Sequence, residues 1–179
     1  MNKKDSLDTH QANSDKYTFK RLVGQGSYGQ VFRAKERATK KAVAIKFIDF
    51  THESPELIRA ICREVKTLMF LSKLQSNIYT VKLLDIFMEA SFDPADPQSM
   101  HGIYLVTNYC SIDLVKAIVD TQEKFTRSQA LSLAFNLLTA VKYLHLANII
   151  HRDLKPENIL VTESLEVQII DFGLARTID

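Results

Sequence analysis

The sequence has few of the features that mark secreted or membrane-bound proteins. Its 179 residues include only two cysteines, Cys62 and Cys110, too few for a disulfide framework, and neither has a Cys or His neighbour at metal-ligand spacing. The first residues lack the apolar run of a signal peptide, and no apolar stretch is long enough to span a bilayer. These absences predict a reducing setting in the cytoplasm or nucleus, without membrane insertion.

The sequence also lacks a large excess of either positive or negative charge. Lys and Arg number 23 and Asp and Glu number 21, so the formal net charge is +2, and the basic residues are scattered along the chain. No strong field therefore draws the protein toward nucleic acid. With 46% hydrophobic and 25% charged residues, the composition is that of an ordinary globular protein.

The order of the periodic segments predicts an α+β protein of two lobes, because strands come first and helices later. Residues 1–15 are polar and predict a disordered leader. The predicted strands cover residues 17–23, 30–33, 42–48, 83–87 and 102–107. Two later apolar runs, at 159–161 and 167–170, predict a small hairpin.

Two helices are expected in addition to these strands. Residues 54–56 form a helix start, and apolar positions recur at helical spacing from there to about Leu71. Glu64 lies at the edge of this apolar stripe, so its carboxylate points toward whatever the helix packs on. A capping box at 126–129 begins a second helix that we expect to be long and buried. Its apolar face consists of Leu131, Ala134, Phe135, Leu138 and Val141.

A glycine-rich segment follows the first predicted strand. Gly24, Gly26 and Gly29 leave backbone amides unobstructed by side chains, so a polyphosphate can lie against them. The same spacing fits a plain hairpin turn. It also fits a dinucleotide-binding fold, in which Asp49 would be the acid about 20 residues on and a helix would follow Gly29 directly. The segment alone leaves these three alternatives open.

A lysine within an apolar strand favours a phosphate site. Strand alternation puts Lys46 on the same face as Ala44 and opposite Val43 and Ile45. A lysine that snorkels from a strand end would explain this position as well. Glu64, an acid on an apolar helix stripe, could neutralise the lysine and hold it toward phosphates, so Lys46 and Glu64 form a candidate ion pair.

Two acidic motifs near the end of the chain carry the strongest signal. Residues 151–158 follow one apolar pair and residues 171–173 follow another. An acid beside a substrate hydroxyl can orient it and accept its proton, and a second acid with an amide oxygen supplies hard ligands for Mg²⁺. Asp153 fits the first role, and Asp171 with Asn158 fits the second.

In their order along the chain, these motifs resemble those of eukaryotic protein kinases, from about Tyr17 to Asp179. The resemblance implies a partial kinase domain over residues 16–179, with a β-rich N-lobe at 16–107, a hinge at 108–112 and the start of a helical C-lobe at 113–179. It also implies ATP and Mg²⁺ as cofactors and protein substrates phosphorylated on serine or threonine.

The resemblance also implies which residues bind ATP. Lys46, held by Glu64, would contact the α and β phosphates, Thr107 would be the gatekeeper, and Asp113 would lie near the ribose. The full set comprises Val23, Gly24, Gly26, Gly29, Val31, Ala44, Lys46, Thr107, Tyr109, Asp113 and Leu160.

Four further residues carry the chemistry that the resemblance implies. Asp153 would be the catalytic base, and Lys155, typical of serine/threonine kinases, would stabilise the transferring γ-phosphoryl. Asn158 and Asp171 would hold Mg²⁺. Arg152 beside Asp153 is the arrangement of kinases that an upstream kinase switches on by phosphorylating the activation loop.

Within the family, the segments at 103–107, 143–145, 147–151 and 174–176 most resemble the mitogen-activated protein kinase branch. Cyclin-dependent kinases are close relatives, but the helix segment 56–64 does not resemble their cyclin-binding signature. The sequence ends before the family's remaining activation loop and helical platform. We therefore expect residues 1–179 alone to be poorly stable and weakly active or inactive; an alternative is a nucleotide-binding or interaction fragment without catalysis.

Overall fold

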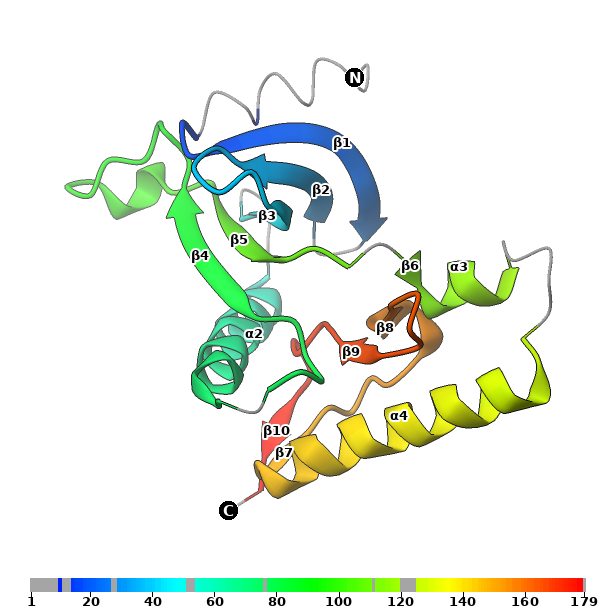
Figure 1. Cartoon of the computed structure of the whole chain (residues 1–179). Coiled ribbons are helices and arrows are strands. Elements are labelled where there is room, and N and C mark those ends of the chain that lie inside the picture. The colour runs from blue at the N-terminus through cyan, green and yellow to red at the C-terminus, as the bar shows by residue number, and fades with distance from the viewer. Residues whose placement is uncertain are drawn as a thin grey trace. The chain divides into compact units, whose positions relative to one another are not determined.

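The computed structural model of the chain describes residues 10, 14–26, 29–50, 54–75, 77–110, 112–119 and 125–178. These fall into two units (Figure 1). Unit 1 comprises Met1–Ile58 and Leu83–Tyr109, and unit 2 comprises Arg59–Lys82 and Cys110–Asp179. None of the helices among the described residues combines the length and apolar character that a membrane span needs.

Unit 1 is built on a five-stranded antiparallel sheet with the strand order β1-β2-β3-β5-β4. The strands are β1 (Tyr17–Gly26), β2 (Gly29–Glu36), β3 (Ala42–Asp49), β4 (Leu83–Met88) and β5 (Gly102–Asn108). All five predicted strands are thereby confirmed. Because β2 starts at Gly29, the helix that a dinucleotide-binding fold requires there is replaced by a strand, and that alternative is wrong. The loop between β4 and β5 contains a short 3-10 helix, η1 (Pro97–Ser99).

One face of this sheet carries an aromatic core. Its buried members are Tyr17, Phe19, Phe32, Ala34, Val43, Ile45, Tyr104 and Val106. Burial of each large apolar side chain stabilises the fold by about 1.5–3 kcal/mol. Because successive side chains of a strand point to opposite faces, the core fixes which residues the other face presents.

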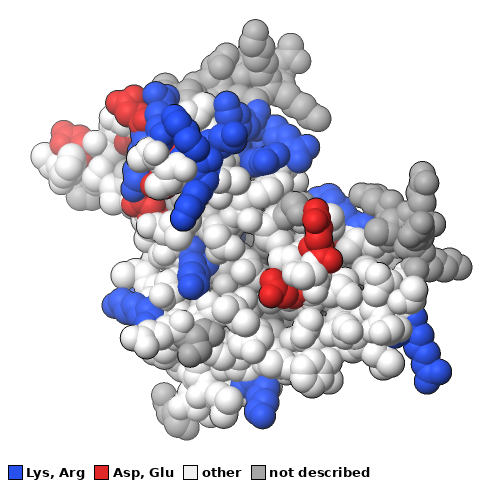
Figure 2. Space-filling view, viewed as in Figure 1, with Lys and Arg blue, Asp and Glu red and all other residues white. Residues whose placement is uncertain are grey.

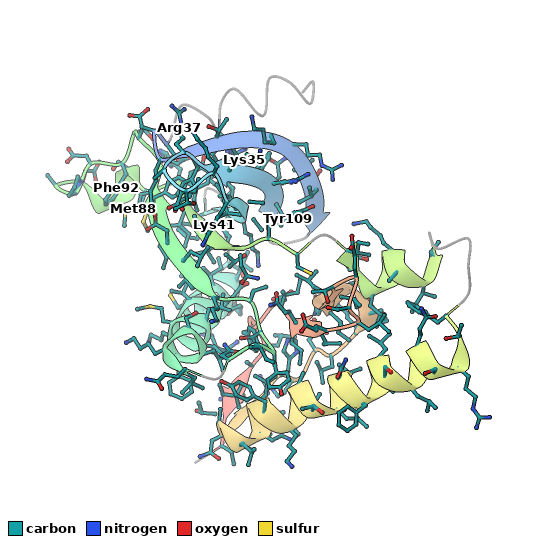
Figure 3. The ribbon with its side chains drawn as sticks, in the orientation of Figure 1. Lys35, Arg37, Lys41, Met88, Phe92 and Tyr109 are labelled. Carbon is teal, nitrogen blue, oxygen red and sulfur yellow. The ribbon has the colours of Figure 1, made fainter. Side chains whose placement is uncertain are left out.

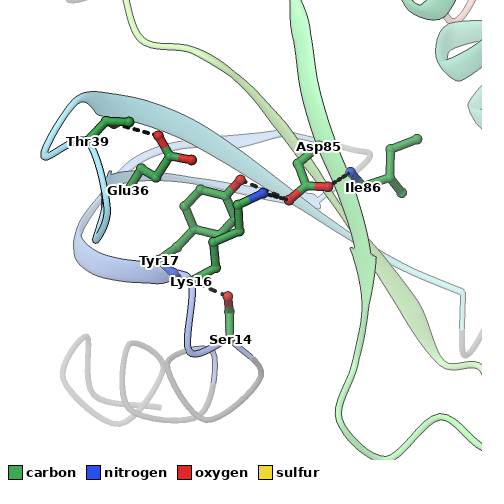
Figure 4. Close-up of polar contacts among 7 residues, drawn as sticks. All are labelled: Ser14, Lys16, Tyr17, Glu36, Thr39, Asp85 and Ile86. Carbon is green, nitrogen blue, oxygen red and sulfur yellow. Dashed lines mark hydrogen bonds and ion pairs between the residues drawn. The ribbon is translucent and has the colours of Figure 1, made fainter.

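Side chains at the two edge strands of the unit 1 sheet, β1 and β4, contact each other (Figure 4). The Tyr17 hydroxyl donates to Asp85 Oδ2 across 2.9 Å, and Lys16 Nζ lies 2.7 Å from the same oxygen. The Tyr17 ring also stacks on Phe87 at a centroid distance of 5.8 Å. Burial, and then the bond to Asp85, raise the pKa of Tyr17 to about 12, so this hydroxyl keeps its proton at neutral pH.

Unit 2 combines helices with two small sheets. The helices are α2 (Pro55–Lys73), which begins in unit 1, α3 (Leu114–Val119), α4 (Arg127–Leu146) and the 3-10 helix η2 (Pro156–Asn158). The strands are β6 (Ile112–Asp113), β7 (Ile149–Ile150), β8 (Ile159–Val161), β9 (Val167–Ile169) and β10 (Arg176–Thr177). One sheet has the order β6-β8-β9 and the other pairs β7 with β10, so the predicted hairpin is β8–β9.

Both predicted helix starts are confirmed. The Ser54 hydroxyl oxygen accepts a hydrogen bond from the Leu57 amide at 3.3 Å, immediately before α2. Thr126 and Gln129 form the capping box that begins α4. Such caps satisfy backbone amides that have no partner within the helix, which is why these short patterns locate a helix end.

The predicted apolar face of α4 is exposed, and the expectation of a buried helix is wrong for this face. Leu131, Phe135 and Leu138 are 62%, 69% and 70% exposed, and Ala134 is exposed as well. The buried residues of the helix are Ala140 and Leu144, and the helix packs on β7 and β9. Because α4 is apolar on more than one side, periodicity alone could not choose the face that packs.

Candidate active site

Unit 1 presents its candidate nucleotide-binding residues on the sheet face opposite the aromatic core. Val31 pairs with Lys46 across β2 and β3, and Ala44 pairs with Thr107 across β3 and β5. Paired residues point to the same face, and so do Ala44 and Lys46, two positions apart. The prediction that Lys46 shares a face with Ala44, away from Val43, is therefore confirmed. All four side chains are half-buried.

The glycine-rich segment joins β1 to β2, with Gly24 paired to Val31 and Gly26 paired to Gly29. Gly29 has φ +134°, and a Cβ there would overlap the backbone carbonyl of Phe47 in β3. At Gly24, an added Cβ would meet only Val31, at an ordinary 3.7 Å. Glycine is therefore required at Gly29 by backbone conformation and by the close approach of β3, a constraint that motif spacing alone did not reveal.

Basic side chains gather on unit 1 although they are scattered along the sequence. Figure 2 shows Lys and Arg together over the strands of this unit, and Figure 3 labels Lys35, Arg37 and Lys41 on β2 and the hairpin that follows it. The Arg33 guanidinium lies 5.0 Å from the centre of the Tyr109 ring, at the end of β5, within the range of cation–π attraction. Arg33 was not among the predicted site residues.

In unit 2, the ring of His151 forms hydrogen bonds within the first acidic motif and with the residue before the second. It is 2% exposed, and its Nε2 lies 2.9 Å from the Ile170 carbonyl oxygen. Its Nδ1 accepts a hydrogen bond from the Asp153 amide at 3.2 Å, so Nε2 carries the proton and donates to Ile170. The Ile170 amide in turn donates to the Asn158 carbonyl at 3.0 Å. These bonds place the segment before Asp171 beside the end of the 151–158 motif.

Asp153 is the centre of a polar cluster. Lys155 Nζ lies 2.9 Å from Asp153 Oδ2, and Asn158 Nδ2 donates to the same oxygen and to the Asp153 carbonyl, both at 2.9 Å. The bond from Lys155, more than that from Asn158, lowers the pKa of the Asp153 carboxyl, which keeps it ionised at neutral pH. Since both contacts use Oδ2, Oδ1 is the oxygen that can accept a hydrogen bond from a substrate hydroxyl.

Backbone strain marks both motifs. Arg152 and Asp171 have φ values of 66° and 64°, in the left-handed region that residues other than glycine rarely adopt. Arg152 Nε donates to the Leu174 carbonyl at 2.7 Å, and the Arg63 side chain of α2 donates to the Gly173 carbonyl. Strained residues of this kind persist where the surroundings hold them, and they cluster at functional sites.

The oxygens of Asn158 and Asp171 suit a hard divalent cation. Both hydrogen bonds of the Asn158 side chain use Nδ2, so Oδ1 remains for a cation, although Asn158 is only 5% exposed. Asp153 first, and the charge of Asp171 as well, raise the pKa of Lys155. Within the described ranges, no group of three or more His, Cys, Asp or Glu side chains could hold a metal. Asn158 and Asp171 would thus leave positions open for phosphate and water oxygens.

Three further predicted residues have structural partners in unit 2. Leu160 pairs with Asp113 across β8 and β6, so these two members of the predicted ATP set are neighbours. Asp113 also accepts from the Lys116 amide at 2.8 Å and from Lys116 Nζ at 2.7 Å. Glu64 is 6% exposed, on the buried face of α2 with Ile61. The ion pair of Lys46 with Glu64 joins residues of different units and stays a prediction.

Comparison with known proteins agrees with these motifs. A model of the protein kinase domain matches residues 17–179. Mitogen-activated protein kinase p38b of Drosophila melanogaster is 39% identical over 155 residues, which are 86% of this chain and 40% of that protein. Cyclin-dependent kinase 20 of Danio rerio is 35% identical over 162 residues, 90% of this chain and 43% of that protein.

A third relative, mitogen-activated protein kinase HOG1 of Alternaria brassicicola, is 37% identical over 166 residues, 93% of this chain and 42% of that protein. The chain thus spans about two fifths of the length of the curated relatives it matches. The similarity covers both units and includes both acidic motifs.

Proposed function

Because the chain belongs to the protein kinase family, we propose that it transfers the γ-phosphoryl group of ATP to serine or threonine hydroxyls of protein substrates. The observation that carries this proposal is the cluster of Asp153, Lys155 and Asn158, in which an ionised carboxylate is fixed by a cation and a buried amide. Positioning of this kind is the main contribution that a protein makes to phosphoryl transfer.

Each residue of the cluster has a distinct role in this proposal. Asp153 Oδ1 orients the substrate hydroxyl and accepts its proton, while Oδ2 stays held by Lys155 and Asn158. Lys155, which is exposed, places its positive charge where the transferring phosphoryl becomes most negative. Asn158 and Asp171 hold the divalent cation, which we propose is Mg²⁺. When bound, this ion neutralises charge on the phosphates.

The sheet face of unit 1 supplies the nucleotide contacts in this proposal. Backbone amides of the glycine-rich segment lie against the phosphates, and Lys46 contributes a positive charge from β3. Val31 and Ala44, on the same face, offer apolar contact to the adenine, with Thr107 as their neighbour on β5.

We place the protein in the mitogen-activated branch of the family, as two of the relatives named above suggest. Its substrates would be proteins phosphorylated on serine or threonine, and an upstream kinase would activate it. A cytoplasmic or nuclear location, without nucleic acid as a partner, fits this role. The relative named as a cyclin-dependent kinase marks the neighbouring branch as the alternative.

A nucleotide titration tests the assigned site. We expect Lys46→Met and Asp171→Ala each to weaken the binding of ATP with Mg²⁺ by at least about tenfold, since each removes a charge that faces the phosphates or the ion. Lys142→Met, at an exposed position of α4 outside the predicted ATP set, is the matched control and should leave the affinity for ATP with Mg²⁺ unchanged. Unchanged affinity in both site variants would refute these assignments.

A second candidate function is nucleotide or partner binding without catalysis. The observation that favours it is the exposed apolar face of α4, which includes Phe135 at 69% exposure. Assays of binding and of transfer on purified residues 1–179 separate the two functions. Under the second candidate, the chain binds ATP with Mg²⁺ but transfers no phosphoryl to serine or threonine peptides. Robust peptide phosphorylation would reject it, together with the expectation that the chain alone is weakly active or inactive.

A further inference from the structure

His10 lies in the aromatic core of unit 1, although it precedes the first strand. It is 7% exposed, and its ring meets four aromatic rings on four different positions of the sheet. The centroid distances are 4.6 Å to Phe32, 4.8 Å to Phe47, 5.7 Å to Tyr104 and 6.2 Å to Phe19. A polar ring thus occupies a place that an apolar side chain would ordinarily fill.

Both ring nitrogens of His10 have hydrogen-bond partners in this core. Nδ1 lies 2.8 Å from the Tyr104 hydroxyl, and Nε2 lies 3.2 Å from Gln30 Oε1. An amide oxygen can only accept, so Nε2 carries the proton and Nδ1 accepts from Tyr104. The ring is therefore the neutral imidazole, with one nitrogen donating and the other accepting.

The surroundings of the His10 ring favour a neutral imidazole over a phenyl ring or an imidazolium. A phenyl ring would meet the same aromatic walls but could bond neither Tyr104 nor Gln30. An imidazolium would place a buried charge among aromatic rings, and burial accordingly lowers the pKa of His10. Among the described residues that contact the ring, Tyr104 alone is titratable, and a phenol is ordinarily neutral at neutral pH.

We propose that the aromatic face of the unit 1 sheet contains a binding site for a neutral imidazole ring, built by Gln30, Phe32, Phe47 and Tyr104 and filled by His10. The site anchors His10, which precedes β1 in the chain, to strands β2, β3 and β5. One of its two hydrogen-bonding residues, Gln30, directly follows Gly29, so the site lies next to the last glycine of the glycine-rich segment. Neither the proposed kinase activity nor the family assignment requires this site.

The test is rescue of a cavity variant by free imidazole. His10→Gly removes the ring, and we expect it to lower the melting temperature at pH 8. Added imidazole should restore that temperature in a saturable way, with little change in the wild-type protein, whose site is filled. Adding Tyr104→Phe to His10→Gly should weaken imidazole binding about fivefold, the usual effect of one lost hydrogen bond. Tyr143→Phe, which removes a buried hydroxyl of unit 2, should not change imidazole binding.

If His10→Gly does not fold, a measurement on the wild-type protein tests the proposal instead. Nitrogen NMR should show His10 as the neutral tautomer protonated at Nε2, titrating below the ordinary pKa of histidine because burial lowers the pKa of its ring. The contacts of His10 with its site should contribute their whole stabilisation above pH ~6.5, the ordinary pKa of histidine. It should be lost as pH falls through the lower pKa of the folded state, because the unfolded chain then binds more protons.

Two results would overturn the proposal. One is imidazole stabilisation that is equal in His10→Gly and wild type, or that is missing in a folded His10→Gly. The other is a His10 ring that titrates at or above the ordinary pKa of histidine. These readouts do not involve nucleotide or phosphoryl transfer, so a failure of the proposed kinase activity would leave them unaffected.

Discussion

The side-chain amide of Asn158 donates to two oxygens of Asp153, the backbone carbonyl and carboxylate Oδ2, each across 2.9 Å. A buried amide thus fixes both the backbone and the side chain of Asp153, the proposed catalytic base, and it leaves its own oxygen for a cation. One residue thereby connects the two roles that we propose for the site, orientation of the hydroxyl and coordination of the ion.

Replacement of Asn158 should therefore reduce stability and ion binding together. We expect Asn158→Ala to lower the free energy of unfolding by about 1–3 kcal/mol, because two oxygens of Asp153, one of them charged, lose their donor, and to weaken binding of Mg²⁺ with ATP. Chemical denaturation and a Mg²⁺ titration at fixed nucleotide measure the two effects. Asn136→Ala is a matched control, since Asn136 donates to the Leu165 carbonyl at 2.8 Å, between α4 and the β8–β9 turn. The control should lose stability and keep its affinity for Mg²⁺; equal loss of Mg²⁺ affinity in both variants would contradict the assigned role.

Lys155 should control the acidity of Asp153. In Lys155→Met, the pKa of the Asp153 carboxyl should rise toward its ordinary value. The substitution removes the hydrogen bond from Lys155, which is the largest cause of the lowered pKa. The effect is modest, since the Lys155 side chain is 47% exposed and solvent screens the pair. Carbon NMR of the carboxyl group across an acid titration measures it. Lys116→Met should raise the pKa of Asp113 and leave that of Asp153 unchanged.

The sign of the resulting pH dependence follows from the lowered pKa of Asp153. Stability from this carboxylate is present above about pH 3.9, the ordinary pKa of aspartate. It is lost as pH falls through the lower pKa of the folded state. Lys155→Met should flatten this part of the stability curve, and an unchanged curve would argue against the ion pair in solution.

Two glycines of the same motif should differ in their tolerance of alanine. Gly29→Ala should lower the free energy of unfolding by about 1–3 kcal/mol, because φ +134° is strained for alanine and the methyl group would overlap the Phe47 carbonyl. Gly24→Ala should have a much smaller effect on stability, since its methyl group meets only Val31 at 3.7 Å. Thermal denaturation of the two variants compares them directly. Equal losses would show that the close approach of β3 does not constrain Gly29.

The exposed face of α4 should drive self-association. Contiguous exposed apolar patches promote contacts between molecules, so light scattering of purified residues 1–179 should rise with protein concentration. The triple variant Leu131→Gln, Phe135→Gln and Leu138→Gln should scatter less, with unchanged helix content. Leu144→Gln, at a position only 1% exposed, is the opposite control and should unfold unit 2. Equal association of the triple variant and the wild type would contradict the prediction.

Local patterns located most of the helices and strands. The alternation around Lys46 gave the correct face of β3, and the capping box at Thr126 gave the correct start of α4. Both follow from backbone periodicity and from hydrogen bonds within a few residues, which the sequence contains directly. The burial of Glu64 on α2 was also correctly anticipated from its place on the apolar stripe.

Contacts between distant residues were beyond the reach of these patterns. The bonds of His151 to Ile170 and of Arg63 to Gly173 join positions far apart in the chain, and no spacing rule encodes them. The same holds for His10, which meets Tyr104 although 94 positions separate them. Residues 27 and 28 of the glycine-rich segment lie outside the described residues, so the expectation for them stays a prediction.

The sequence by itself determined the strands, the helix starts and the identity of the acidic motifs, because each depends on neighbours along the backbone. Only the tertiary structure decided which side of α4 is buried, why Gly29 must be glycine and where the His10 ring lies. Those outcomes depend on the shape of the surface that other segments provide. Because several strands form that surface together, the local sequence of one strand does not specify it.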